Sequence, residues 1–207
     1  MPSGEVHSSV EAVASDNSHA RALVDNATST LIALEARLNA LDAKVGDGDT
    51  GSTFAAGARD IAQKLAQNQL PLNDTAALLQ LIGERLATVM GGSSGVLMSI
   101  FFTAAGQKVA EGAPLPGALL VGLAQMKHYG GAAPGDRTLI DALQPALEVL
   151  QRHDLAAAAQ AAEQGAKATA QMGKARAGRS SYIGRDNLEG VEDPGAVAIA
   201  EVFKAMT

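Results

Sequence analysis

Residues 20–53 read ARALVDNATSTLIALEARLNALDAKVGDGDTGST, and this stretch combines the repeating element of the fold with a candidate site. Apolar residues recur at steps of three or four, at Leu23, Ala27, Leu31, Leu34, Leu38 and Leu41. That spacing places them on one face of an amphipathic helix, which the pattern predicts over residues 20–43. The glycines of the following VGDGDTGS end this helix. The stretch therefore predicts a helix that leads directly into an acidic, glycine-rich loop.

The same helical period returns along the rest of the chain, and no segment reads as a convincing strand. The predicted helices cover residues 20–43, 54–65, 75–89, 96–104, 116–129, 139–150 and 154–173, with an eighth from Pro194 onward. We expect Pro145 to kink the sixth helix or to lie in a restarted first turn. Only 3% of the residues are aromatic, so Ala and Leu must fill the core, which favours close-packed helices.

The loops between these helices alternate in character. Ordinary connections alternate with glycine-rich, polar ones at residues 44–53, 91–95, 130–136 and 174–193. If neighbouring helices run antiparallel, every second loop lies at the same end of the bundle. The sequence therefore predicts an all-α fold, an eight-helix antiparallel up-and-down bundle with four special loops at one end.

Composition excludes several classes of protein. Sixteen basic residues against 22 acidic ones give a net charge of −6, which argues against a nucleic-acid surface. The chain has no cysteine, which excludes disulfides, and no apolar run long enough to span a bilayer. Residues 1–17 lack the pattern of a secretory signal. We expect them to form a flexible leader or linker remnant before a domain of residues 18–207, in a cytoplasmic protein.

Three aspartates surround the first special loop. Asp47 and Asp49 flank one glycine, so an extended backbone would point both to the same side, and Asp42 lies close by at the end of the helix. Three carboxylates this close repel one another unless a cation is bound between them. Hard oxygen ligands suit Mg²⁺, so we predict a metal site at Asp42, Asp47 and Asp49. A solvated turn is the alternative, since Asp and Gly are common turn formers.

Two other motifs match this loop only in part. Gly46, Gly48 and Gly51 have the spacing of the dinucleotide fingerprint, but that fingerprint follows a strand and here a helix precedes it. A calcium-binding EF-hand loop starting at Asp47 would need glycine and glutamate at positions that hold Ser52 and Ala58. Neither alternative fits.

Two helix starts have the composition of phosphate sites. Thr50, Gly51, Ser52 and Thr53 open the second helix, and residues 91–95, GGSSG, precede the fourth. A helix N-terminus offers unpaired N–H groups and a positive dipole end to an anion. Each motif alone is more often an N-cap, but two of them are predicted beside three aspartates. The P-loop motif is absent from the sequence.

The last special loop offers one candidate cation. Arg179 is a candidate phosphate contact and catalytic residue, because a guanidinium matches phosphoryl oxygens in geometry. We read Lys174, Arg176 and Arg185 as solvated charges, and Asp136 as a cap of the sixth helix.

Together these motifs resemble one family, the nucleotide-binding domain or subunit of dihydroxyacetone kinases. The matching segments, in family order over residues 20–207, are LDAKVGDGDTGSTF, MGGSSGVLMSIFF, GAAPGDRTLIDAL, GRSSYIG and DPGA. The resemblance implies an eight-helix antiparallel barrel with ATP or ADP bound at one end. It implies two Mg²⁺ ions at Asp42, Asp47 and Asp49, with phosphates at Thr50, Gly51, Ser52, Thr53, Ser93 and Ser94. It also implies nucleotide contacts at Gly130, Leu139, Arg179, Asp193, Pro194 and Gly195.

Members of this family are of two kinds. Single-chain kinases use exchangeable ATP, whereas phosphotransferase-system subunits hold ADP and usually have histidine where this chain has Thr50. Thr50 favours the first kind. In both, a partner domain holds the triose through a histidine, so this chain alone is expected to bind Mg-nucleotide without phosphorylating dihydroxyacetone. The alternatives are a fatty-acid kinase nucleotide domain, which shares DGDTG, and a helical regulatory bundle that binds lipid in its core.

Overall fold

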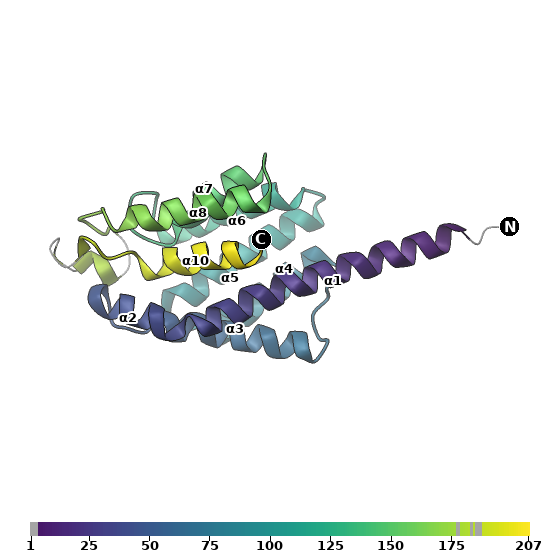
Figure 1. Cartoon of the computed structure of the whole chain (residues 1–207), viewed down its shortest axis with the longest axis horizontal. Helices are drawn as coiled ribbons and strands as arrows, with labels where there is room; N and C mark the ends of the chain where they lie inside the picture. Colours follow the sequence, from purple (N-terminus) through teal and green to yellow (C-terminus); the bar gives the residue numbers. More distant parts are fainter. Residues whose placement is uncertain (1–3, 177–178, 183, 185–187) are drawn as a thin grey trace.

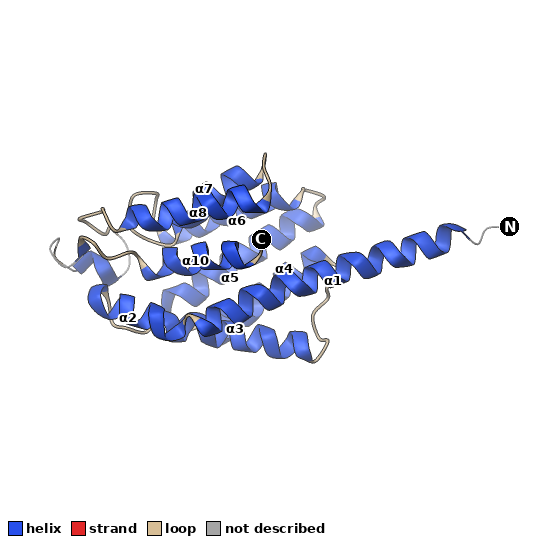
Figure 2. Ribbon diagram, viewed as in Figure 1, coloured by secondary structure: helices blue, strands red, loops and turns tan. Residues whose placement is uncertain are grey.

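The computed structural model describes residues 4–176, 179–182, 184 and 188–207, without the side chains of residues 4–16, 179 and 180. Within that part of the chain every regular element is a helix (Figure 2). The helices are α1 (Gly4–Ala33), α2 (Glu35–Val45), α3 (Thr50–Ala66), α4 (Thr75–Val89), α5 (Gly92–Ala110), α6 (Leu115–Gly130), α7 (Ile140–Leu150), α8 (Leu155–Thr169), the 3-10 helix η1 (Arg179–Tyr182) and α10 (Pro194–Ala205). The predicted all-α class is confirmed.

Consecutive helices pack side by side and close into a ring. Contacts run from α3 to α4, α5, α6, α7 and α8 in turn, and α8 packs on α10. The last helix α10 returns to α1 and α2, which also cover α3. This is the closed antiparallel arrangement that short connections between amphipathic helices produce.

The first predicted helix is present but divided in two. Helix α1 ends at Ala33 and α2 begins at Glu35, with Leu34 as the junction. The backbone hydrogen bonds continue across it, since Leu34 N–H donates to Thr30 and the Leu34 carbonyl accepts from Leu38. Because the helical hydrogen bonds continue, the spacing of apolar residues also continues across Leu34. The sequence pattern therefore did not reveal the interruption.

The start of α1 lies where a leader was expected. The helix begins at Gly4, so residues 4–17 are helical in the structure. Figure 1 shows the first part of α1 projecting beyond the other helices. None of the described helices is both long enough and apolar enough to cross a membrane.

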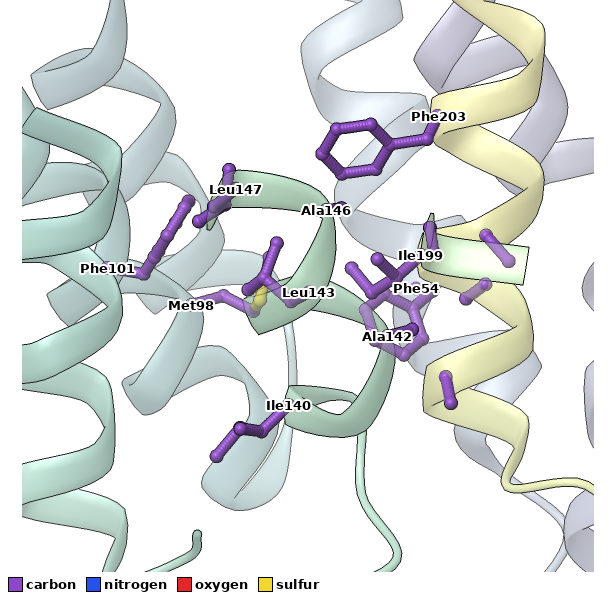
Figure 3. Packing of buried hydrophobic residues seen from close by; sticks show 14 of the residues in the cluster. Phe54, Met98, Phe101, Ile140, Ala142, Leu143, Ala146, Leu147, Ile199 and Phe203 are labelled. Atoms are coloured by element: carbon purple, nitrogen blue, oxygen red, sulfur yellow. The ribbon is translucent and has the colours of Figure 1, made fainter. Parts of the chain in front are cut away.

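The core fills the space inside the ring. Phe54 of α3, Met98 and Phe101 of α5, and Phe203 of α10 are buried with the apolar face of α7 (Figure 3). Small residues such as Ala142 and Ala146 lie between them and allow the helices to approach closely. Helix α7 continues through Pro145 rather than restarting there.

Candidate functional site

The acidic loop is shaped by a buried carboxylate. Asp42, on the last turn of α2, is only 6% exposed, and its Oδ2 accepts hydrogen bonds from the backbone N–H groups of Asp49 (2.9 Å) and Thr50 (3.1 Å). The chain turns sharply here at Gly46, where a Cβ would lie 2.3 Å from Asp42 Oδ1. The loop is thus folded back over Asp42.

This turn brings the three predicted metal ligands together. One carboxylate oxygen from each of Asp42, Asp47 and Asp49 lies within 4.8 Å of the others. Asp42 is buried, whereas Asp47 and Asp49 are exposed toward solvent. Three converging carboxylates with an open side fit Mg²⁺, which takes one or a few carboxylates and fills its other positions with water or phosphate oxygens.

Two helix N-termini face the same space. Helix α3 begins at Thr50 and α5 begins at Gly92, and the preceding residues, Asp49 and Gly91, make no side-chain cap hydrogen bond. The first N–H groups of a helix have no partner within the helix and can receive an anion, as at α5, whereas at α3 the Thr50 and Ser52 N–H groups already donate to Asp42 and Asn39. Gly92 has φ +64°, a conformation that favours glycine, and it lets the chain turn directly into α5.

The opposite wall comes from two segments distant in sequence. The loop before α7 is held by Asp141, whose carboxylate accepts hydrogen bonds from the N–H groups of Gly135 (2.5 Å) and Thr138 (2.8 Å). Helix α10 begins beside it and is capped by Asp193, which accepts from Ala196 N–H (2.8 Å). The Asp193 N–H donates to Thr169 Oγ1 (2.8 Å), so α8 also fixes this start.

These segments enclose one cavity of about 320 Å³. Its volume lies at the lower end of the range for small-molecule sites. Eleven predicted site residues line it, namely Asp42, Asp47, Asp49, Thr50, Thr53, Ser93, Ser94, Leu139, Asp193, Pro194 and Gly195. The first two special loops meet here with the residues that follow the third loop and with Asp193 at the end of the fourth, which agrees with the end predicted from the alternating loop pattern.

Three predicted residues lie outside the lining of this cavity. Gly51 packs against α2, since a Cβ there would lie 2.1 Å from the Glu35 carbonyl oxygen. Ser52 is held by Asn39, which accepts from Ser52 N–H (3.0 Å) and donates to Ser52 Oγ (2.9 Å). Gly130 closes α6 against Leu97. Arg179 begins η1, and its side chain lies outside the described part of the structure.

The structure adds Arg137, which the sequence analysis did not select. This residue lines the cavity although it is only 1% exposed, and its Nη2 donates to the Val191 carbonyl (2.5 Å). Its position in GDRT, directly after the special loop of residues 130–136, was the available signal in the sequence. Asp136 in that motif accepts from Ala133 N–H (2.8 Å) in its own loop, rather than capping α7.

Burial shifts the pKa values of two charged residues in this wall, Asp193 and Arg137. Removal from water raises the pKa of Asp193 to about 6, with Asp141 and Asp42 adding to the rise and Arg137 opposing it. Burial likewise lowers the pKa of the Arg137 guanidinium, and the charge of Asp193 acts in the opposite direction. The two buried charges thus compensate each other in part.

Comparison with known proteins gives a consistent result. The family described as DAK2 domain matches residues 44–207. A dihydroxyacetone kinase of Citrobacter freundii is 61% identical over 199 residues, covering 95% of this chain and 36% of that protein. A triokinase/FMN cyclase of Rattus norvegicus is 42% identical over 196 residues, covering 89% of this chain and 33% of that protein.

Solved structures agree with the sequence matches. The native crystal structure of the C. freundii kinase has a TM-score of 0.81 at 60% identity, covering 90% of this chain and 33% of that one. The structure of the C. freundii kinase in complex with AMP-PNP and Mg²⁺ has a TM-score of 0.78 at 59% identity, covering 89% and 32%. The chain therefore spans about a third of the length of these relatives.

Proposed function

Because the chain belongs to the DAK2 domain family, we propose that it is the Mg-ATP-binding, phosphoryl-donor domain of a dihydroxyacetone kinase. The observation that carries this proposal is the shared cavity, in which three carboxylates converge beside the starts of α3 and α5. A relative of 59% identity and matching fold was solved with AMP-PNP and Mg²⁺.

Each wall of the cavity takes a role under this proposal. Asp42, Asp47 and Asp49 would hold magnesium, two ions by the family pattern, and magnesium supplies positive charge that offsets the phosphates. The hydroxyls of Thr50 and Thr53, with the N–H groups and hydroxyls at Ser93 and Ser94, would bind the phosphates. Leu139, Asp193, Pro194 and Gly195 would contact the rest of the nucleotide, and Arg179 would approach from the last loop.

The triose is assigned to another domain. The kinases that this chain resembles are about three times its length, which leaves room for a substrate-binding part. In both relatives the matching segment is part of one longer chain, which supports the single-chain, ATP-exchanging kind. The alternative, an ADP-holding subunit of a phosphotransferase system, would retain ADP through purification. A lipid-binding regulatory bundle has less support, because buried side chains of facing helices pack together inside the ring.

Titration of ADP with and without Mg²⁺ tests the proposed site. The wild-type chain is expected to bind ADP in a Mg²⁺-dependent way. Asp47→Asn keeps the size of the side chain and removes one anionic ligand, so it is expected to abolish that dependence. Asp25→Asn, at an exposed position of α1, is the matched control and should bind like wild type. Metal-dependent ADP binding that survives Asp47→Asn would refute this metal site.

A further inference from the structure

Arg137 joins the two segments that form one wall of the cavity. The residue lies in the loop before α7, and its Nη2 donates to the carbonyl of Val191, 54 residues later, at 2.5 Å. Val191 leads directly to Asp193, Pro194 and Gly195, which line the cavity at the start of α10. Thr138 and Leu139, which follow Arg137, line the cavity beside them, since a Cβ at Gly195 would lie 3.2 Å from Leu139 Cβ. One guanidinium therefore connects the two segments that form this half of the site.

The remaining donors of Arg137 are not explained by stability. Its Nε and Nη1 are buried and have no hydrogen-bond partner among the described residues. Unpaired buried donors are uncommon in proteins and destabilise the fold. A methionine of similar length would avoid the cost of these two donors, although it would leave the buried charge of Asp193 without compensation.

The backbone holds Arg137 in an unfavourable conformation. Its φ is +61°, which is uncommon for a residue other than glycine. The carboxylate of Asp141 fixes the chain on both sides, by accepting from Gly135 and Thr138. Strained residues held in this way occur mostly at functional sites, where the surroundings over-determine their geometry.

On the premise of the proposed function, we infer that Arg137 is a positioning residue, which sets the spacing between the α7 loop and the α10 start on the nucleotide side of the cavity. Its burial argues against direct contact with phosphate, because solvent does not reach Nε or Nη1. It is also the one basic residue among the described residues that line the cavity, and its charge compensates the buried Asp193.

The test combines nucleotide affinity with hydrogen exchange in three variants. Arg137→Met removes the charge and the donors, and Arg137→Lys keeps the charge and one donor for the Val191 carbonyl. Arg176→Met is the matched control, because the Arg176 side chain is 70% exposed in a neighbouring segment and its ion pair with Asp136 is long, at 4.0 Å. ADP and AMP affinities are measured at saturating Mg²⁺. Exchange of the amides of residues 190–197 is followed without nucleotide, and thermal unfolding verifies that each variant is folded.

Arg137→Met is expected to weaken ADP and AMP binding by a similar factor, about tenfold or more. The amides of residues 190–197 should exchange about tenfold faster, while those of α4 keep their rates. Arg137→Lys should recover part of both losses, and Arg176→Met should match wild type.

Three results would overturn the inference. The first is Arg137→Met with unchanged affinity. The second is an Arg137→Met variant that loses more affinity for ADP than for AMP while the amides of residues 190–197 exchange as in wild type. That result would indicate direct contact with phosphate. The third is a folded Arg137→Lys no better than Arg137→Met. If wild type binds no ADP, the proposed function fails, whereas the exchange rates still decide whether Arg137 ties the two segments.

Discussion

Asp193 combines a structural role with a buried charge. It caps α10 through Ala196 N–H and is only 7% exposed, so ionisation is costly there. A folded-state pKa of about 6, above the ordinary 3.8, means that the folded protein binds the proton more tightly than the unfolded chain. Folding stability from this group therefore falls as pH rises from about 4 to about 6, and it stays low above that.

Asp193→Asn should accordingly stabilise the metal-free protein at neutral pH. Asparagine caps a helix about as well as aspartate and carries no charge. The rise in pKa corresponds to roughly 3 kcal/mol, so the variant should gain about 2–3 kcal/mol in free energy of unfolding above pH 6 and almost nothing below pH 4. Denaturant unfolding from pH 4 to 8 in EDTA measures this, and a gain that does not change with pH would contradict it.

Single residues differ in how far sequence identifies them. Asp42, Asp47 and Asp49 are separated by a few positions, so local spacing was enough to predict that their carboxylates would converge. Arg137 depends on Val191, which is distant in the chain, and on a left-handed backbone fixed by Asp141. A local sequence pattern predicts neither the contact with Val191 nor the left-handed backbone at Arg137. The same holds for Ser52, whose Asn39 partner turns it away from the cavity.

At the scale of elements, close contacts between helices explain why glycine occupies two helical positions, Gly51 and Gly165. Helix α3 starts against α2 at Gly51, and α7 meets α8 at Gly165, where a Cβ would lie 2.1 Å from the Asp141 carbonyl oxygen. Pro145 has no N–H to offer this carbonyl, so the approach of α8 occurs where the α7 ladder is incomplete. The sequence predicted α7 and its proline, but the packing of α8 against that position could not be deduced from periodicity.

Gly51→Ala should destabilise the fold through the α2–α3 contact. The new Cβ would meet the backbone of Glu35, which cannot move without shifting α2. Overpacking of this kind costs about 1–3 kcal/mol, or a fall of several degrees in Tm. Gly117→Ala in α6 is the control, because its Cβ would have 3.9 Å to the nearest atom and helix propensity alone should leave Tm equal or higher. Equal Tm values for wild type and Gly51→Ala would refute this contact.

At the scale of the whole molecule, the packed body begins within α1. Arg21 donates to the Leu65 carbonyl (3.2 Å) and to Asn68 Oδ1 (2.7 Å), which ties α1 to the end of α3. Thr28 is buried further along the same helix. The earlier part of α1 projects from the ring (Figure 1). We therefore propose that residues 18–207 form the nucleotide domain and that residues 1–17 link it to other parts.

Removal of residues 1–16 should then leave the domain intact. Tolerance of truncation depends on which backbone and side chains pack, and Arg21, which ties α1 to the end of α3, lies beyond the segment removed. The shortened chain is expected to keep its Mg-ADP affinity within about twofold and its Tm within about 2 °C. Calorimetry and thermal unfolding check both values. A large fall in Tm would place part of the core in the segment assigned to the linker.

The ring of helices builds the cavity at one end, and under the proposed function half of the reaction belongs to another domain. Among the described residues, apolar side chains pack together inside the ring, and the cavity volume of about 320 Å³ is needed by the nucleotide phosphates and metal under the proposed function. The chain alone is therefore expected to bind Mg-ATP without phosphorylating dihydroxyacetone. Adding the part of the C. freundii kinase that this chain does not match, purified separately, should produce dihydroxyacetone phosphate in a coupled assay.

Asp47→Asn provides the control for this complementation, because it should abolish product formation while the helical fold and Tm persist. The substrate part alone must also be inactive, so that the phosphoryl donor is assigned to this chain. Steady turnover by the unmixed chain would contradict the division of labour, whereas failure of the mixture despite Mg-dependent ADP binding would indicate a different acceptor substrate. Tests of other short-chain hydroxyketones as acceptors would then separate substrate choice from loss of the domain contact.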